Sequence, residues 1–184
     1  MKKKLVLLIL LFTINETSAS VKKNIVQNLK TTQNLTFNFE QNINGNTENG
    51  MCALAYPKKI FCRYNLPNKK ILVSNGQSVV IKTTSSYYSY PLDRTPLNLI
   101  LDKNFLLNKI NNLNERIIEN KLVNFKFFES DFEVNIFFDP SNYNLIGWQT
   151  TDIYQNLSIT FLSSIKKNQK LDDNLFTLPK KKIR

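Results

Sequence analysis

The sequence predicts a mainly β protein in which one antiparallel sheet curves or closes into a barrel, with two short helices left to cover an opening or an edge. Short runs with alternating apolar and polar residues recur along most of the chain. Turn signals separate these runs roughly every 8–12 residues, as in sandwiches and barrels. Helical spacing of apolar residues predicts helices in two segments, 21–32 and 95–101.

The first element is an amphipathic helix over 21–32, because four apolar residues recur there at helical spacing: Val21, Ile25, Val26 and Leu29. A strand over 35–43 follows, in which one face carries alternate residues: Leu35, Phe37, Phe39, Gln41 and Ile43.

Residues 50–81 indicate consecutive short strands, separated by turns at 57–59, 67–70 and 75–76. Alternation places Cys52, Leu54 and Tyr56 on one side of the first strand. It places Ile60, Cys62 and Tyr64 on one side of the second. A hairpin that turns about Pro57 brings Cys52 opposite Cys62, so the register predicts a cross-strand disulfide.

The second half of the chain continues this pattern. A strand is expected over 87–92, and a short helix then begins with Thr95 as N-cap and Pro96 at the first helical position. One face of that helix carries Leu97, Ile100 and Leu101. Further strands are expected over 122–128, 132–138, 145–151 and 157–163, and a turn or short helix over 171–178 closes on Phe176.

The N-terminus has the parts of a secretory signal peptide: Lys2–Lys4, an apolar run over 5–12, and small polar residues over 17–20. Cleavage after Ala19 or after Ser20 fits equally, and the alternative is an ordinary buried first helix. We expect 1–20 to be the signal peptide, 21–179 a single domain and 180–184 a basic tail. An exported chain meets oxidising conditions, which favours the disulfide.

The formal net charge of +11 is concentrated at the two ends. It falls by three without Lys2–Lys4 and by four more without the basic residues of 180–184. The remaining body is only mildly basic, whereas a nucleic-acid-binding domain carries a basic stripe with interleaved aromatics. We therefore expect no nucleic acid partner. The tail is either solvated or available to an anionic lipid or an acidic partner.

Residue types needed for most catalysis are missing or misplaced. The chain has no histidine, which excludes Ser-His-Asp and Cys-His arrangements and imidazole metal sites. Its four glycines lie at turns or strand ends, so no glycine-rich phosphate loop is present. Carboxylates that could form acid–base pairs lie near turns, where they are solvated: Glu129, Asp131, Glu133, Asp172 and Asp173. We expect a protein that is not an enzyme and uses no cofactor or metal.

Binding to an apolar surface is the remaining function class. Six side chains are expected to point inward from the strands: Phe37, Phe39, Leu54, Tyr56, Ile60 and Tyr64. They either fill a dry core or line a cavity, since curved sheets of this size hold one hydrophobic ligand when helices cap the mouth. The residue pattern does not separate these two alternatives.

Motifs in a fixed order carry a resemblance to a known family. They are Gly50 and the strand to Pro57, Phe61–Tyr64, Pro67, Ile71–Gly76, Tyr90–Leu92, Thr95–Leu101, Ile136–Asp139, Asp152, Ile159–Phe161, Leu171–Phe176 and Pro179. Together they resemble the periplasmic outer-membrane lipoprotein carrier (LolA) family over nearly the whole mature chain. The resemblance implies an incomplete antiparallel barrel whose helices form a lid over a hydrophobic cavity.

The family's functional positions transfer residue by residue. Segments 21–30 and 95–101 match the lid helices, which gives five lid residues: Ile25, Leu29, Leu97, Ile100 and Leu101. Positions that line the cavity in the family match Leu54, Ile60, Cys62 and Val80. Many members carry a lid-latching arginine just before the matching proline, where this chain has Tyr56. We therefore predict that the Tyr56 hydroxyl bonds a lid carbonyl instead.

The resemblance implies a monomeric periplasmic carrier. Such a carrier receives acylated lipoproteins from an inner-membrane ABC transporter and passes them to an outer-membrane acceptor. The alternatives are a related module that binds another amphiphile or acts in envelope signalling, and a structural β domain that binds no lipid.

Overall fold

The computed structural model describes residues 20–152 and 154–181. These residues form three α-helices, α1 (Val21–Thr31), α2 (Leu97–Leu101) and α3 (Lys103–Asn112), and two 3-10 helices, η1 (Leu92–Arg94) and η2 (Asp173–Phe176). Their strands are β1 (Asn34–Ile43), β2 (Asn46–Ala55), β3 (Lys59–Tyr64), β4 (Ile71–Asn75), β5 (Ser78–Lys82), β6 (Tyr87–Pro91), β7 (Arg116–Ile118), β8 (Leu122–Glu129), β9 (Phe132–Phe138), β10 (Leu145–Asp152) and β11 (Leu157–Lys167).

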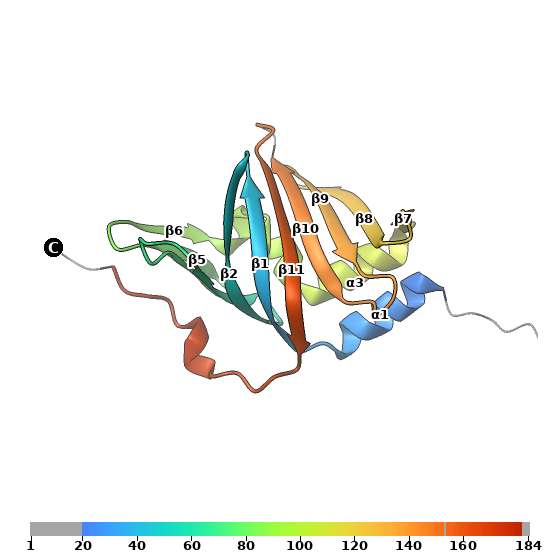
Figure 1. Cartoon of the computed structure of the whole chain (residues 1–184), viewed down its shortest axis with the longest axis horizontal. Coiled ribbons are helices and arrows are strands. Elements are labelled where there is room, and N and C mark those ends of the chain that lie inside the picture. Colours follow the sequence, from blue (N-terminus) through green and yellow to red (C-terminus); the bar gives the residue numbers. More distant parts are fainter. Residues whose placement is uncertain (1–19, 153, 182–184) are drawn as a thin grey trace, which may run out of the picture.

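One antiparallel sheet contains every strand in the order β6-β5-β4-β3-β2-β1-β11-β10-β9-β8-β7. The first and last strands of this order are edges, so the barrel is incomplete (Figure 1). Strands that follow each other in the chain pair with each other, except β6 and β7, which form the two edges, and β1 pairs with β11 in the middle of the sheet. The predicted fold class is confirmed, as an open sheet.

The hairpin of β2 and β3 has the predicted register. Leu54 lies opposite Ile60, and Cys52 lies opposite Cys62. The two cysteine sulfurs are bonded, with 4.1 Å between the Cα atoms. The disulfide therefore joins two neighbouring strands and fixes which side chains share their concave face.

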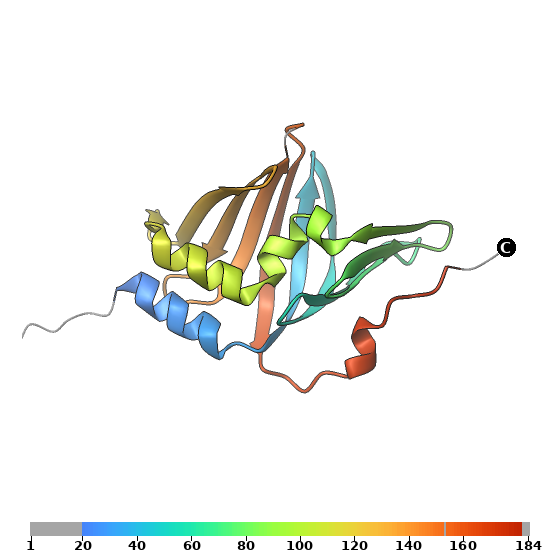
Figure 2. The ribbon, with the colours of Figure 1, turned by 180° about the vertical axis from the view of Figure 1, so that it is seen from behind.

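The helices lie across the concave side of the sheet (Figure 2). The Ser20 side chain caps α1 by accepting a hydrogen bond from the Lys23 N–H, as serine does at many helix starts. Asp102 caps α3 in the same way, through the Phe105 N–H. Helices α1 and α3 pack on each other, and Lys103 Nζ donates to the Thr32 carbonyl at 3.0 Å.

Three elements were not predicted from the sequence: η1, α3 and β7. Phe105, Leu106 and Ile110 have helical spacing, and Leu106 and Ile110 are buried in the core. The Phe105 ring packs edge-on against Phe127 of β8, with 5.7 Å between the ring centroids. This contact anchors α3 on the concave face.

The start of α2 differs from the prediction. Pro96 has helical φ and ψ, but no side chain caps the helix. The Thr95 hydroxyl instead donates to the Leu92 carbonyl at 2.8 Å and closes η1. The prediction that Thr95 caps this helix is therefore wrong, because its hydroxyl is already used by the preceding turn.

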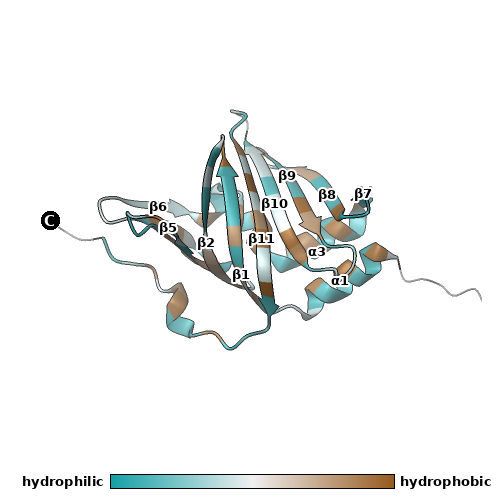
Figure 3. Cartoon of the chain, in the orientation of Figure 1, coloured by the Kyte–Doolittle hydropathy of each residue, from teal (hydrophilic) through white to brown (hydrophobic). Residues whose placement is uncertain are grey.

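Apolar and polar residues alternate along the strands (Figure 3). Residues paired across the sheet form rows on the concave face, and one row runs Phe37, Cys52, Cys62, Leu72 and Ile81. The core lies between these rows and the helices.

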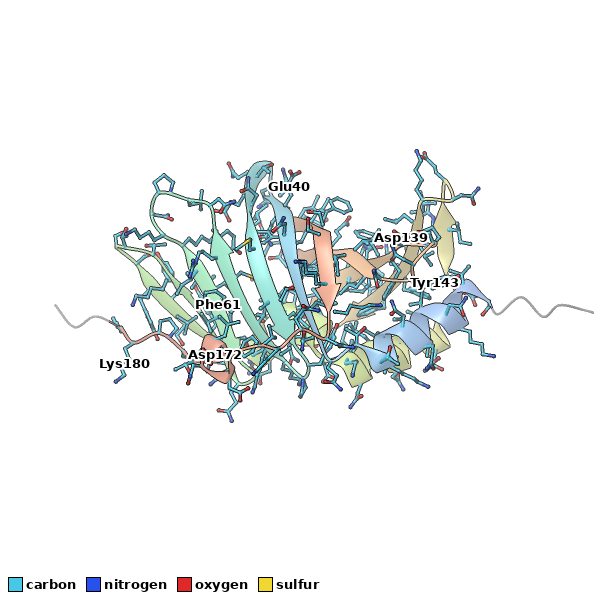
Figure 4. All side chains as sticks on the ribbon, turned by 60° about the horizontal axis from the view of Figure 1, so that its bottom comes forward. Glu40, Phe61, Asp139, Tyr143, Asp172 and Lys180 are labelled. Atoms are coloured by element: carbon cyan, nitrogen blue, oxygen red, sulfur yellow. A yellow bond between two sulfur atoms is a disulfide. The ribbon has the colours of Figure 1, made fainter. Side chains whose placement is uncertain are left out.

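The convex face is covered in part by the C-terminal segment, where the predicted short helix is present as η2. Phe176 is buried, and η2 packs on β3 and β4. Figure 4 shows Phe61 and Asp172 on this side of the molecule. A groove lies there between β3 and the C-terminal segment, and Phe61, Leu171 and Leu175 are among the residues that line it.

The predicted signal peptide, apart from Ser20, lies outside the described residues, and so does the end of the basic tail. Over 20–152 and 154–181, no helix has both the length and the apolar character needed to span a bilayer.

Candidate ligand cavity

A cavity of about 200 Å³ lies between the concave face of the sheet and α2. Its wall is mostly apolar. The lining residues are Phe37, Phe39, Gln41, Ile43, Cys52, Ile60, Cys62, Tyr64, Lys70, Leu72, Ile81, Pro96, Leu97, Ile100, Trp148, Thr150, Ser158 and Thr160.

Aromatic rings form much of the wall. Phe37 meets Trp148 of β10 edge-on at 6.4 Å between the ring centroids, and Phe39 meets Tyr64 at 5.0 Å. Gly50 lies between Phe39 and Tyr64 in the sheet register. A Cβ atom at Gly50 would clash with the Arg63 carbonyl oxygen and would lie 2.9 Å from Phe39 Cε1, so glycine allows the backbone of β3 and the Phe39 ring to approach β2 closely.

The polar part of the wall is gathered around Gln41. Its Nε2 donates to Thr160 Oγ1 at 3.1 Å and to Ser158 Oγ at 3.3 Å, and its Oε1 accepts from the Tyr64 hydroxyl at 3.3 Å. Burial, and in second place the Glu48 carboxylate, raise the pKa of Tyr64 well above its usual range. Tyr64 is therefore a neutral hydrogen-bond donor at physiological pH.

Leu97 and Ile100 of α2 form the roof of the cavity. The end of α2 is fixed to the β2–β3 turn, where the Lys58 N–H donates to the Leu101 carbonyl at 2.9 Å. Lys58 Nζ also lies 3.3 Å from Asp102 Oδ2. Lys58 thus makes the backbone and charge contacts that hold the roof to the sheet.

Tyr56 does not make the predicted bond to a lid carbonyl. Its hydroxyl is buried, and no described residue offers it a hydrogen-bond partner. Burial raises the pKa of Tyr56 far above its ordinary value. Its ring packs against the core beneath Lys103 Nζ, 5.6 Å from the ring centroid. The hypothesis is wrong because the nearby Lys58 binds the end of α2 instead.

The structure brings together six of the predicted cavity and lid residues, namely Phe37, Phe39, Ile60, Tyr64, Leu97 and Ile100, along with both cysteines. It places the other predicted residues elsewhere. Five of them belong to the core or pack against it and do not line the cavity: Ile25, Leu29, Leu54, Tyr56 and Leu101.

Val80 departs most from its predicted place. It pairs with Val73, whereas its neighbour Ile81 pairs with Leu72 and lines the cavity. Because side chains alternate along a strand, Val80 points to the convex face. The cavity is therefore lined by Ile81, the neighbouring residue of β5, and not by the predicted Val80.

Sequence reasoning did not name several lining residues, among them Trp148, Thr150 and Thr160. Alternation within β10 and β11 places them on one face, but nothing local says that this face meets β1. Gln41 and Ile43 were found by alternation and were not assigned to the site. Leu72 follows from the β3–β4 register, which places it opposite Cys62.

Comparison with known proteins agrees with this geometry. The family model for the outer membrane lipoprotein carrier protein LolA matches residues 30–179. Comparison with curated protein sequences finds no match.

Solved structures share the fold at low sequence identity. A conserved protein from Thermus thermophilus is 8% identical, with a TM-score of 0.51 over 87% of this chain and 93% of that one. MucB is 9% identical, with a TM-score of 0.50 over 90% of this chain and 64% of that one. The LolA superfamily protein NE2245 from Nitrosomonas europaea is 10% identical, with a TM-score of 0.45 over 86% and 96%. Since the family model covers most of the sequence, the chain belongs to the outer membrane lipoprotein carrier protein LolA family.

Proposed function

We propose that the protein is a periplasmic carrier that binds the acyl chains of lipoproteins in the cavity beneath α2. In this role it takes lipoproteins from an inner-membrane transporter and passes them to the outer membrane. The observation that supports this most directly is the apolar cavity, with its aromatic wall and its roof on a short helix.

The size of the cavity suits a carrier that must release its cargo. Burying a roughly 16-carbon acyl chain is worth about 13 kcal/mol against water, at about 0.8 kcal/mol per methylene. Several fully buried chains would exceed the ~20 kcal/mol limit of non-covalent affinity. A volume of about 200 Å³ is also below the ~300–1,000 Å³ of most ligand pockets. We infer that α2 moves outward to admit cargo and that the cargo is sheltered incompletely.

Copurification tests this function. The protein is purified from a periplasmic extract without detergent, and its bound molecules are identified by mass spectrometry. A carrier yields acylated polypeptides. Recovery of free phospholipid alone supports a related module that binds another amphiphile, and recovery of no lipid supports a structural domain.

A pair of variants on α2 links the result to the cavity. Leu97→Asp places a carboxylate against the apolar wall, and we expect it to abolish recovery of acylated polypeptide. Asn98→Asp adds the same charge to the same helix at a position that does not line the cavity, and it should leave recovery unchanged. Equal recovery with both variants would contradict binding in this cavity.

A further inference from the structure

Five polar residues form one end of the cavity wall, and we call them the polar rim: Gln41, Tyr64, Thr150, Ser158 and Thr160. Gln41 of β1 pairs with Thr160 of β11, and Ser158 pairs with Thr150 of β10. These pairs place the side chains on the concave face, side by side at the ends of β1 and β11 nearest the β1–β2 turn.

Three hydroxyl groups of the polar rim have protons that donate to no protein acceptor in the described residues. Gln41 donates its two amide hydrogens to Ser158 Oγ and Thr160 Oγ1, so each of these oxygens acts as an acceptor. Neither hydroxyl proton, nor the Thr150 hydroxyl, bonds an acceptor within the described part of the chain. Thr150 and Thr160 are only 7% and 2% exposed. Because buried hydroxyls normally donate, these groups suit a ligand that brings acceptors.

The charge beside the polar rim is balanced. Lys70 is the charged residue of the cavity wall, and its Nζ pairs with the Glu48 carboxylate and lies 4.2 Å from the centroid of the Tyr64 ring. Both partners are mostly buried, with side chains 17% and 22% exposed. An anionic ligand group at this point would find the cation of the cavity wall, Lys70, already neutralised by Glu48. A neutral acceptor, such as a carbonyl oxygen, needs no cation and does not pay the cost of an unpaired charge.

The cavity has apolar residues along most of its wall and hydroxyl donors at one end. An acyl ester or amide has the matching arrangement, a hydrocarbon chain with a carbonyl at its head. A hydrocarbon chain fits the region of Phe37, Ile60 and Ile100, and the carbonyl at its head then reaches the hydroxyl donors. We propose that the polar rim binds this carbonyl, so that the cavity prefers ester- or amide-linked acyl chains to free fatty acids and alkyl phosphates. The inference rests on the proposed function, since it takes the cavity to hold acyl chains.

Competition binding tests this preference with the delipidated, disulfide-bonded protein. A fluorescent acyl probe is displaced by four compounds of equal chain length: monopalmitoylglycerol, N-palmitoylethanolamine, palmitate and hexadecyl phosphate. The ester and the amide should bind at least about fivefold more tightly than the two anions, because an anionic group at the rim loses its water and finds Lys70 already paired with Glu48.

Variants then locate the preference. Thr160→Val keeps the shape of the side chain and removes its hydroxyl, and it should weaken ester binding about fivefold while palmitate binding stays the same. Ser158→Ala is a second rim variant at a less buried position. Thr47→Val, on the exposed part of β2, is the matched control and should change neither affinity.

Two results overturn the inference in different ways. Equal affinity for all four compounds, or an equal loss for ester and palmitate in Thr160→Val, refutes the role of the polar rim and leaves the carrier function standing. Failure of every acyl compound and of the probe to bind refutes both.

Discussion

Lys58 and Asp102 form an ion pair of 3.3 Å that joins the β2–β3 turn to the junction of α2 and α3. The same turn donates the Lys58 N–H to the Leu101 carbonyl. Tyr56, the residue predicted to bind the lid, takes no part in this contact. Lys58, on the far side of Pro57 from Tyr56, is thus the cation that holds the roof.

Lys58→Met should speed the release of a bound acyl probe about fivefold, because it removes up to about 1 kcal/mol from the contact that keeps α2 down. Asp102→Asn should have a similar effect, since asparagine keeps the cap of α3 and loses the charge. Stopped-flow release of the probe measures both. Lys30→Met, on the exposed face of α1, is the control. Unchanged release in both test variants would show that the ion pair does not hold the roof.

Tyr56→Phe should raise the free energy of unfolding by about 1 kcal/mol, because it removes a buried hydroxyl that has no partner in the described structure. Tyr64→Phe should lower the free energy of unfolding by a similar amount, since the Tyr64 hydroxyl bonds Gln41. Denaturant unfolding of the two variants gives opposite signs if the assignment is right. Destabilisation by Tyr56→Phe would mean that its hydroxyl has a partner.

Reduction of the Cys52–Cys62 bond should destabilise the protein by about 3 kcal/mol, because the bond closes a short loop in the unfolded chain. For a chain of this size the melting temperature then falls by roughly 6–12 °C. Calorimetry with and without a thiol reductant measures the change, and the Cys52→Ala, Cys62→Ala double variant should melt at the reduced value whether or not reductant is present. Two free thiols in the denatured, unreduced protein would refute the bond.

Asp139 should make the protein less stable in acid. The Ser141 hydroxyl, then the backbone N–H groups of Ser141 and Asn142 and the Asn142 side chain, bond its carboxylate and hold its pKa below the ordinary value. A depressed folded-state pKa stabilises the protein above the unfolded value of about 3.9. That contribution is lost as the pH falls through the folded pKa.

The turn over 139–143, which Asp139 stabilises, also contacts α1: the Asn28 side chain donates to the Tyr143 carbonyl at 2.6 Å. Figure 4 shows Asp139 and Tyr143 in this turn. Unfolding free energy measured from about pH 6 down to about pH 2 should therefore fall less steeply in Asp139→Asn than in the unchanged protein. Asp131→Asn, at an exposed turn position, should keep the original slope. Identical slopes in all three proteins would contradict the assignment.

The local sequence pattern determined the strands β1 to β3, their concave-face residues and the disulfide. Alternation in 35–43 and 50–64 identified the concave-face residues of β1, β2 and β3, and the turn about Pro57 identified the disulfide. A strand repeats every two residues and a tight hairpin fixes its own register, so both results follow from neighbouring residues alone.

The tertiary structure decided the rest, because it depends on contacts between distant parts of the chain. Pairing of β1 with β11 brings Thr160 to Gln41, and the contact of Phe105 with Phe127 places α3 on the concave face. The β4–β5 register gives the cavity Ile81 rather than Val80. Lys58 rather than Tyr56 holds the roof, since only the folded β2–β3 turn shows which donor reaches Leu101 and Asp102.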